Sequence, residues 1–365
     1  MSTDLPVKTT PHVAVIGSGV AGASTAFALA RAGVRVTLVD AASTGAATPA
    51  GAGIIMPWAT RSEGPFYGLY AAGAEYYPRL LEQLAAVGVD DVDYRVTGGL
   101  IVHDDEDLLR TTAERISARI TGSAVAGTLR RVDAEEAHGL FPPLRPGLSG
   151  LHLGGAARVD GRSLRDGLIR GALACGAELI EAEATLVPSR TTSGAPDIVA
   201  AGRVVSPTAV VVAAGAWTDQ VLAPLGVHTG VVPQRGQILH LCADGHTTDD
   251  WPSVHPLSDV YMVAFGGSRL VFGATREDGS GIDVRRTAAG QRKLFDGVLE
   301  LAPGLAEATV VETRVGIRPM SPEALPIARQ LSAGVWANAG FGPAGLTMGP
   351  LVGHRLARDV LAATA

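Results

Sequence analysis

The chain has 365 residues, of which 47% are hydrophobic and 18% are charged, and this composition excludes an intrinsically disordered protein. Its length allows a large core and predicts two domains. A formal net charge of −6 gives no basic footprint, so we expect no nucleic-acid partner.

The two cysteines, Cys175 and Cys242, lie far apart and lack C-x-x-C spacing. They are typical of a reduced, cytoplasmic protein and predict no metal site. The first ten residues are polar, and no run of about 18 apolar residues occurs in the chain. We therefore expect neither a signal peptide nor an integral membrane span.

The first motif is a glycine-rich turn between a strand and a helix. Residues 13–16 are an apolar run typical of a buried parallel strand, and G-x-G-x-x-G follows before an alanine-rich stretch. In this pattern Gly17 makes the tight turn, Gly19 lets the backbone approach a pyrophosphate, and Gly22 lets the helix pack closely on the strand. The N–H groups of the helix N-terminus would then face the phosphates.

A second apolar strand, residues 34–39, ends at Asp40. Asp40 follows Gly22 by 18 residues (40 − 22), the spacing at which an acidic side chain meets a ribose hydroxyl. A carboxylate would repel a 2′-phosphate, which disfavours NADP. The βαβ unit therefore predicts a dinucleotide site, leaves FAD and NAD open, and has a purely structural glycine loop as its alternative.

A long loop of small residues, 42–58, follows the ribose acid. Loops of this length inside a compact domain are usually functional, and residues 54–58 are too apolar for a solvated linker. We expect its backbone to pack against a flat cofactor; a flexible linker is the alternative.

The central part of the chain alternates between predicted helices and strands. Helices are expected at 66–87, at 104–120, at 132–137 as a short N-capped helix, and from the capping Asp160 to about Cys175. Strands are expected at 96–102, 177–181, 183–188 and 198–205. A fully apolar strand, 209–214, stops at Gly215-Ala216-Trp217. Cofactor contacts gather at such carboxyl ends of parallel strands.

More alternating segments follow at 231–241, 260–264, 269–274 and 309–317. They predict a separate antiparallel sheet that covers one face of the cofactor. The C-terminal part then predicts a strand at 335–339, a glycine loop at 340–345 and a helix at about 349–361. This second glycine loop could direct N–H dipoles at a flavin pyrimidine edge, or it could be a simple strand–helix turn.

These motifs together resemble the D-amino-acid oxidase family of FAD oxidoreductases, which includes glycine and sarcosine oxidases and D-amino-acid dehydrogenases. The resemblance covers nearly the whole chain, and it favours FAD over NAD. It depends on the βαβ motif with Asp40 and on Ser43-Thr44-Gly45-Ala46, Ala213–Trp217, Pro233–Gln237, Gly273-Ala274-Thr275, Gly316-Ile317-Arg318-Pro319 and Gly340–Gly349.

The resemblance implies an α/β fold, α+β overall, with a Rossmann-like FAD-binding domain and an interleaved substrate domain built on an antiparallel sheet. The expected FAD-binding domain is discontinuous and comprises residues 1–85, 140–216 and 315–365. Residues 86–139 and 217–314 are expected to form the substrate-binding domain.

The resemblance also assigns roles to two side chains. Arg318 matches the family arginine that holds the substrate carboxylate, a task suited to its bidentate, permanently charged guanidinium. Tyr261 matches a tyrosine whose hydroxyl helps to hold the same carboxylate. A surface salt bridge for Arg318 and a core phenol for Tyr261 are the structural alternatives.

Motif and resemblance together predict the FAD contacts. They are Gly17, Gly19, Val20, Ala21, Gly22, Asp40, Ala41, Thr44, Gly45, Ala46, Gly51, Ala52, Gly53, Ile54, Ala184, Ala214, Gly215, Trp217, Gly342, Pro343, Ala344, Gly345, Leu346 and Thr347. Sarcosine-oxidase relatives attach flavin to a cysteine near the carboxylate-binding segment, but residues 316–323 contain none, so we expect non-covalent FAD.

The expected reaction is oxidation of a small amino acid (a D-amino acid, glycine or an N-substituted amino acid), with hydride transfer from the α-carbon to flavin N5. Positioning of the C–H bond is its main requirement, so no general base is assigned, and His103, His255 and His354 are expected to be structural. A 2-hydroxy acid or cyclic secondary amine as substrate, or a non-catalytic FAD-binding protein, are the alternatives. The electron acceptor, whether oxygen, a quinone or an electron-transfer partner, stays open, as does the side-chain preference.

Overall fold

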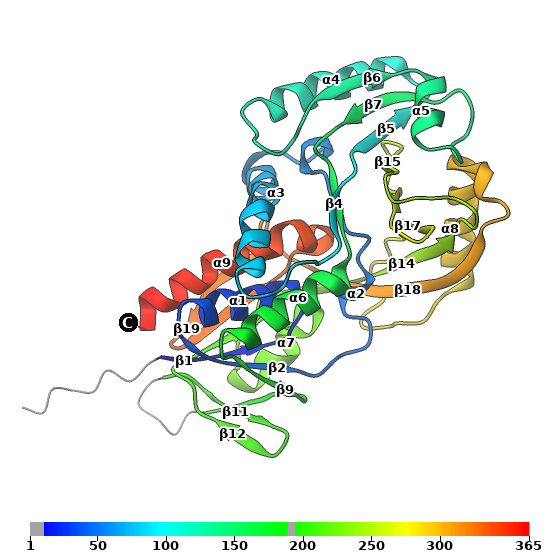
Figure 1. The fold of residues 1–365 in the computed structure, drawn as a ribbon. Helices are drawn as coiled ribbons and strands as arrows, with labels where there is room; N and C mark the ends of the chain where they lie inside the picture. The colour runs from blue at the N-terminus through cyan, green and yellow to red at the C-terminus, as the bar shows by residue number, and fades with distance from the viewer. Residues whose placement is uncertain (1–10, 189–193, 365) are drawn as a thin grey trace, which may run out of the picture.

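The computed structural model describes residues 11–188 and 194–364 (Figure 1). Two large sheets dominate it, and Figure 1 shows the parallel sheet at the lower left and the larger sheet at the upper right. Of the helices in the described part of the chain, none is long and apolar enough to cross a membrane.

The first sheet has six strands in the order β19-β20-β13-β1-β2-β9. These strands are β1 (His12–Ile16), β2 (Arg35–Asp40), β9 (Glu178–Glu181), β13 (Ala209–Val212), β19 (Ile327–Ser332) and β20 (Val335–Ala339). All neighbours run parallel except β19, which is antiparallel at one edge. β13 is buried along its whole length, as its continuous apolar sequence predicts.

Helices cover one face of this sheet. They are α1 (Val20–Arg31), α3 (Gly64–Ala85), α6 (Gly161–Ala174) and α9 (Gly345–Thr364). α1 packs against both α6 and α9, and Gly353 lets α9 approach closely, because a Cβ there would lie 2.7 Å from the Cβ of Ser24. The other face packs on β10 (Thr185–Val187), β11 (Asp197–Ala200), β12 (Arg203–Val205) and α7 (Thr218–Leu222).

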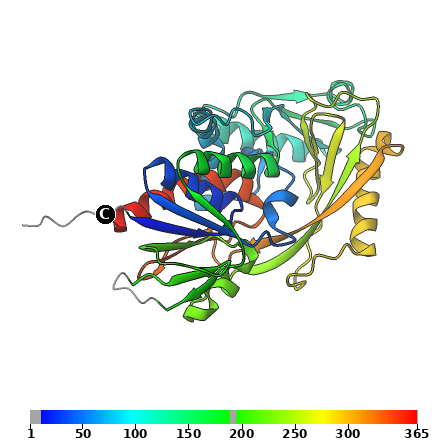
Figure 2. The same cartoon turned by 60° about the horizontal axis from the view of Figure 1, so that its bottom comes forward.

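The second sheet has eight strands in the order β18-β14-β17-β16-β15-β5-β7-β6. They are β5 (Gly99–His103), β6 (Leu129–Val132), β7 (Ser149–Leu153), β14 (Val232–Cys242), β15 (Ser253–His255), β16 (Tyr261–Ala264), β17 (Arg269–Gly273) and β18 (Thr309–Met320). Only the pair β15–β5 is parallel among these described strands. In Figure 2 the orange β18 runs from beside the parallel sheet to the far end of the large sheet.

Two helices, α5 (Ala134–Leu140) and α8 (Ala288–Leu301), pack on an apolar cluster of the large sheet that includes Leu100, Leu239 and Phe272. α4 (Glu106–Ile120) packs beside β5 and is capped by Asp105, whose carboxylate accepts from the N–H groups of Asp107 and Leu108. A small sheet of β3 (Ile54–Ile55), β8 (Ala157–Val159) and β4 (Tyr94–Val96) completes this region.

Four predicted elements differ from the structure. The single strand predicted at 198–205 is a hairpin of β11 and β12, because the chain reverses at Ala201 and Gly202, which have φ of +50° and +72°. Segment 42–58 contains a one-turn helix, α2 (Ala47–Ala50), β3 and the start of a 3₁₀ turn at Pro57–Ala59, because its apolar residues are buried. The strand predicted at 96–102 is interrupted at Gly98, whose φ of +83° ends β4 before β5 starts. α9 starts at Gly345, four residues earlier than expected.

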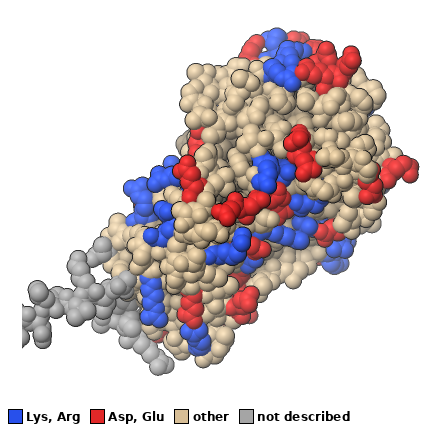
Figure 3. All heavy atoms as spheres, in the orientation of Figure 1, with Lys and Arg blue, Asp and Glu red and all other residues tan. Residues whose placement is uncertain are grey.

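The predicted division into two domains stays a prediction. β7 lies within the stretch 140–216 assigned to the FAD-binding domain, yet it pairs in the large sheet. Likewise β18 continues through residue 315, the boundary assumed from the sequence. On the face shown in Figure 3, acidic and basic side chains of the described residues are interspersed.

Candidate active site

A cavity of about 750 Å³ lies between the two large sheets. Its parallel-sheet side consists of residues 16–21 and 213–217, which follow β1 and β13. Residues of β14, β16 and β18 form the opposite side, and residues 46–54 and 341–347 line it as well. The strand order reverses between β1 and β13, and an open α/β sheet binds its ligand at such a switch point.

The glycine turn after β1 has no room for a side chain at Gly17 or Gly22. Gly17 has a φ of +98°, and a Cβ there would lie 2.4 Å from the carbonyl oxygen of Ala213. A Cβ on Gly22 would lie 1.8 Å from the carbonyl oxygen of Gly17. The turn therefore brings the N-terminus of α1 directly to the cavity, where its N–H groups and dipole favour an anionic group.

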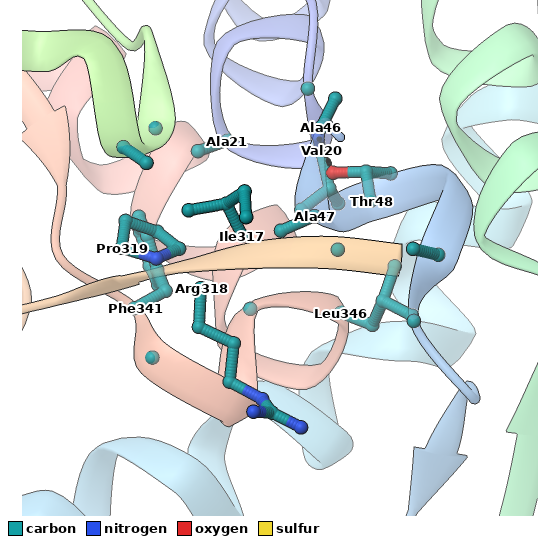
Figure 4. A pocket seen from close by; sticks show the side chains of 18 of the residues that line it. Val20, Ala21, Ala46, Ala47, Thr48, Ile317, Arg318, Pro319, Phe341 and Leu346 are labelled. Atoms are coloured by element: carbon teal, nitrogen blue, oxygen red, sulfur yellow. Dashed lines mark hydrogen bonds between the residues drawn. The ribbon is translucent and has the colours of Figure 1, made fainter. Parts of the chain in front are cut away.

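Thr48 of α2 also contacts this helix end. Its Oγ1 accepts a hydrogen bond from the Val20 N–H at 3.0 Å, and it would lie 3.3 Å from a Cβ on Gly19. Figure 4 shows Thr48 and Ala47 beside Val20. The segment that follows Asp40 thus packs against the glycine turn, while its expected packing against a flat cofactor stays a prediction.

Asp40 lies at the end of β2 in a polar cluster. Its Oδ2 accepts from Ser18 Oγ and from Arg165 Nη2, the latter at 2.9 Å, while its Oδ1 accepts from the Ala42 N–H at 3.0 Å. Arg165 is itself held by the Ser18 carbonyl oxygen at 2.9 Å. A carboxylate has about four acceptor positions, so Asp40 keeps capacity for ribose hydroxyls.

Arg318 extends from β18 into the cavity. Figure 4 shows it on the opposite side of the strand from Ile317, as strand alternation requires. Its Nη1 donates to Gln234 Oε1 at 3.1 Å and to the Thr275 carbonyl oxygen at 3.0 Å, and the Tyr261 side chain lies within hydrogen-bonding reach of the same guanidinium. Its guanidinium lies over Gly236, where a Cβ would be 2.7 Å from both Nη atoms.

Tyr261 of β16 lines the same cavity beside Arg318. Burial raises the pKa of Tyr261, although the positive charges of Arg318 and Arg276 act in the opposite direction. The phenol is therefore neutral at pH 7 and can donate a hydrogen bond. Burial also lowers the pKa of Arg318, but a guanidinium stays protonated at neutral pH.

The cavity brings most of the predicted site residues together. The lining includes Gly17, Gly19, Val20, Ala21, Asp40, Ala41, Ala46, Gly51, Ala52, Gly53, Ile54, Ala184, Ala214, Gly215, Trp217, Tyr261, Arg318, Gly342, Pro343, Ala344, Gly345, Leu346 and Thr347. The assignment of these residues to FAD or substrate stays a prediction.

Three predicted contacts lie outside the lining. Gly22 is buried in the α1–β1 packing and serves the close approach described above. Thr44 and Gly45 line a neighbouring surface pocket instead. Gly45 has a φ of +86° and its carbonyl oxygen accepts from the Ile317 N–H at 2.8 Å, so it holds the loop on β18.

Several lining residues had no signal in the sequence. Arg165, Tyr70 and Asp259 come from segments without a family motif, and Arg276 directly follows the Gly273-Ala274-Thr275 motif but was not assigned to the site. His255, expected to be structural, also lines the cavity; burial lowers its pKa to about 4, so it is neutral at pH 7.

Among the described residues, we find neither a set of metal ligands nor a cysteine placed for covalent attachment of flavin. Within 11–188 and 194–364, no cluster of three His, Cys, Asp or Glu side chains is arranged to hold a metal ion. Both cysteines are free, and neither belongs to the described lining of the cavity.

Three features of the cavity are suited to binding FAD. A glycine cradle without room for Cβ atoms faces the N-terminus of α1, and Asp40 lies beside it with free acceptor capacity. The N-terminus of α9 faces the same space through Gly345, Leu346 and Thr347. The fold and site are thus those of a dinucleotide-binding protein of the Rossmann-like class.

The chain belongs to the DAO family of FAD dependent oxidoreductases, whose family model matches residues 12–358. It is an enzyme that uses FAD, and the resemblance drawn from the motifs is confirmed.

Known relatives cover nearly the whole chain. A glycine oxidase from Pseudomonas aeruginosa is 33% identical over 359 residues, covering 96% of this chain and 94% of the relative. The crystal structure of iminodiacetate oxidase from Chelativorans sp. BNC1 is 45% identical, with a TM-score of 0.91 over 96% of this chain and 95% of that chain. Glycine oxidase from Geobacillus kaustophilus is 26% identical, with a TM-score of 0.83 over 97% and 95%. These solved folds confirm the predicted Rossmann-like architecture.

Proposed function

We propose that this enzyme oxidises a small amino acid (a D-amino acid, glycine or an N-substituted amino acid) at the bond between the α-carbon and nitrogen. One observation carries the proposal: Arg318 reaches the cavity with its Nη1 held by Gln234 and Thr275, and its guanidinium lies beside the neutral phenol of Tyr261. The similarity to glycine oxidases and to an iminodiacetate oxidase supports this substrate class.

The chain's own residues position the substrate. The Arg318 guanidinium can bind a carboxylate in two parallel hydrogen bonds, and Tyr261 can donate a third. Gln234 and Thr275 hold the guanidinium in place through Nη1. When bound, FAD supplies the acceptor for the α-carbon hydride at its N5. The imine product then hydrolyses in water.

No side chain needs to act as a base if the amine binds uncharged. His255 is neutral at pH 7 and Tyr261 keeps its proton, so neither adds charge next to the amine. We propose oxygen as the acceptor, because the similar proteins are named oxidases. We also propose the cytoplasm as the compartment, in keeping with the two free cysteines.

Replacement of Arg318 tests the substrate clamp. For Arg318→Ala we expect kcat/KM to fall roughly 100-fold or more, because a buried charge-assisted pair is lost. FAD should stay bound, and Arg318→Lys should restore only part of the activity, since lysine cannot bind in a bidentate way.

Arg329→Ala is the matched control, because Arg329 is an exposed arginine that pairs with Glu323 and does not line the cavity. It should have wild-type kinetics. Wild-type activity in Arg318→Ala would refute the role of Arg318.

A further inference from the structure

A second arginine, Arg276, lines the same cavity as Arg318. The two approach from adjacent chain segments, since the carbonyl oxygen of Thr275, next to Arg276 in sequence, accepts a hydrogen bond from Arg318 Nη1 at 3.0 Å. The positive charge of Arg276 also acts on both Arg318 and Tyr261. The substrate side of the cavity therefore carries two guanidinium groups.

Arg276 is weakly engaged by the protein. Its Nη2 lies 3.3 Å from Asp259 Oδ1, and the two side chains are 53% and 69% exposed. An exposed pair of this kind contributes about 0–1 kcal/mol. By contrast, Arg235 is only 10% exposed and is bound by Glu277 at 2.7 Å and Asp283 at 2.6 Å, so it has little capacity for a ligand.

Asp259 balances the charge of Arg276 in the substrate-free enzyme. It lines the cavity together with Arg276, so it neutralises the guanidinium while the site is free of substrate. An incoming carboxylate replaces a weak, solvent-exposed contact at small cost. A substrate with one carboxylate leaves the pair intact.

We propose that Arg276 is a second carboxylate anchor and that the preferred substrate is an amine with two carboxylates, one held by Arg318 and Tyr261 and the other by Arg276. This inference rests on the proposed function and specifies its substrate class. The second carboxylate could sit on an N-carboxymethyl arm or on an acidic side chain. The 45% identity to an iminodiacetate oxidase favours the N-carboxymethyl arm.

Binding of inert analogues tests the anchor without turnover. Diglycolate has two carboxylates joined through an ether oxygen, and methoxyacetate is its one-carboxylate counterpart; neither contains an amine. Each analogue is titrated into the FAD-loaded enzyme, and binding is followed by calorimetry and by the visible flavin spectrum. We expect diglycolate to bind more tightly than methoxyacetate by roughly tenfold or more, because it makes one more charge-assisted contact. Arg276→Gln should abolish this difference, and Arg276→Lys should keep part of it.

Asp259→Asn is the matched variant, because it removes the competing carboxylate and leaves Arg276 in place. Its affinity for diglycolate should equal or exceed that of the wild type. Equal affinities of the wild type for both analogues, or an equal loss of both in Arg276→Gln, would overturn the second anchor.

Flavin reduction then shows whether the second carboxylate belongs to an N-carboxymethyl arm or to an acidic side chain. It also separates a failure of the second anchor from a failure of the proposed amino acid oxidation. Faster reduction by iminodiacetate than by D-aspartate or D-glutamate supports the N-carboxymethyl arm, and the reverse order assigns the second carboxylate to a side chain. Reduction by glycine or sarcosine with no preference for dicarboxylates overturns the anchor alone. If no amine reduces the flavin, the proposed function itself fails, whatever the analogues show.

Discussion

At the scale of single residues, the position of Arg318, the proposed substrate clamp, depends on the absence of a side chain at Gly236. The Arg318 guanidinium occupies the space that a Cβ on Gly236 would need, and it is tethered there by Gln234 and Thr275. Gly236 lies on β14 opposite Gly316, and the missing side chain at Gly236 leaves the space that the arginine fills.

We therefore expect Gly236→Ala to displace Arg318. kcat/KM should fall roughly tenfold or more, chiefly through KM, because a misplaced guanidinium binds carboxylate poorly. Steady-state kinetics and the flavin spectrum test this. Gly139→Ala is the control, since a Cβ at that exposed position meets nothing within 4 Å; equal kinetics in both variants would contradict the prediction.

Buried histidines predict a pH dependence of stability. Burial lowers the pKa of His240 to about 4, helped by Arg314 and opposed by Glu312. The unfolded chain binds this proton below about pH 6.5 while the folded protein does not, so the free energy of unfolding falls as the pH drops from 6.5 toward 4. Each such histidine contributes up to about 1.4 kcal/mol per pH unit.

Urea unfolding of the FAD-loaded protein at pH 7 and pH 5 measures this loss. In His240→Leu the difference between the two pH values should shrink, but not vanish, because His255 has a similarly lowered pKa of about 4. An unchanged difference would show that His240 is protonated in the folded state.

At the scale of elements, helix α1, which is predicted to bind the phosphates, packs closely against α9. Gly349 and Gly353 of α9 face α1; a Cβ on Gly353 would lie 2.7 Å from Ser24 Cβ and 2.9 Å from the Thr25 nitrogen. Since both helix N-termini line the cavity, we expect their packing distance to affect the width of the predicted FAD site.

Gly353→Ala should separate the two helices. We expect a loss of stability of about 1–3 kcal/mol, typical of overpacking, together with weaker FAD binding. Thermal unfolding and FAD titration measure the two effects. Gly68→Ala in α3, an exposed helical position with nothing within 4 Å of the added Cβ, should leave both unchanged or slightly increase stability; a loss as large as that of Gly353→Ala would contradict this explanation.

Elements with a local signature were predictable from sequence. The βαβ unit carries its own glycine spacing and acidic residue, and Asp160 caps α6 through the N–H groups of Arg162 and Ser163, as expected. Arg165 and Arg276 were not predictable as site residues, because only tertiary packing brings them to the cavity. The same holds for the start of α9, since its first turn continues the glycine loop without a capping signal.

At the scale of the whole molecule, the cofactor site joins segments from one end of the chain to the other. Residues 16–21, 213–217 and 341–347 all line the cavity between the two large sheets. A ligand that binds only the folded state stabilises it by mass action, by about 2.7 kcal/mol at a concentration 100 times Kd. Loss of FAD should therefore lower the melting temperature of the entire protein in a single transition.

Asp40→Asn should weaken this stabilisation. The neutral amide cannot accept ribose hydrogen bonds as a carboxylate does, so we expect the Kd for FAD to rise about tenfold. Asp166→Asn is the matched control, because Asp166 also pairs with Arg165 but is 62% exposed and does not line the cavity. Equal FAD affinity in the two variants would contradict the ribose role of Asp40.

The most direct test of the central claim is anaerobic flavin reduction in the purified protein by glycine, sarcosine, iminodiacetate and small D-amino acids, with 2-hydroxy acids tested beside them. An FAD-dependent amino acid oxidase should be yellow and should lose its flavin absorbance with at least one of these amines, then regain it in air. A flavin that is reduced by a 2-hydroxy acid but by none of the amines, or that no substrate reduces, would contradict the proposed function.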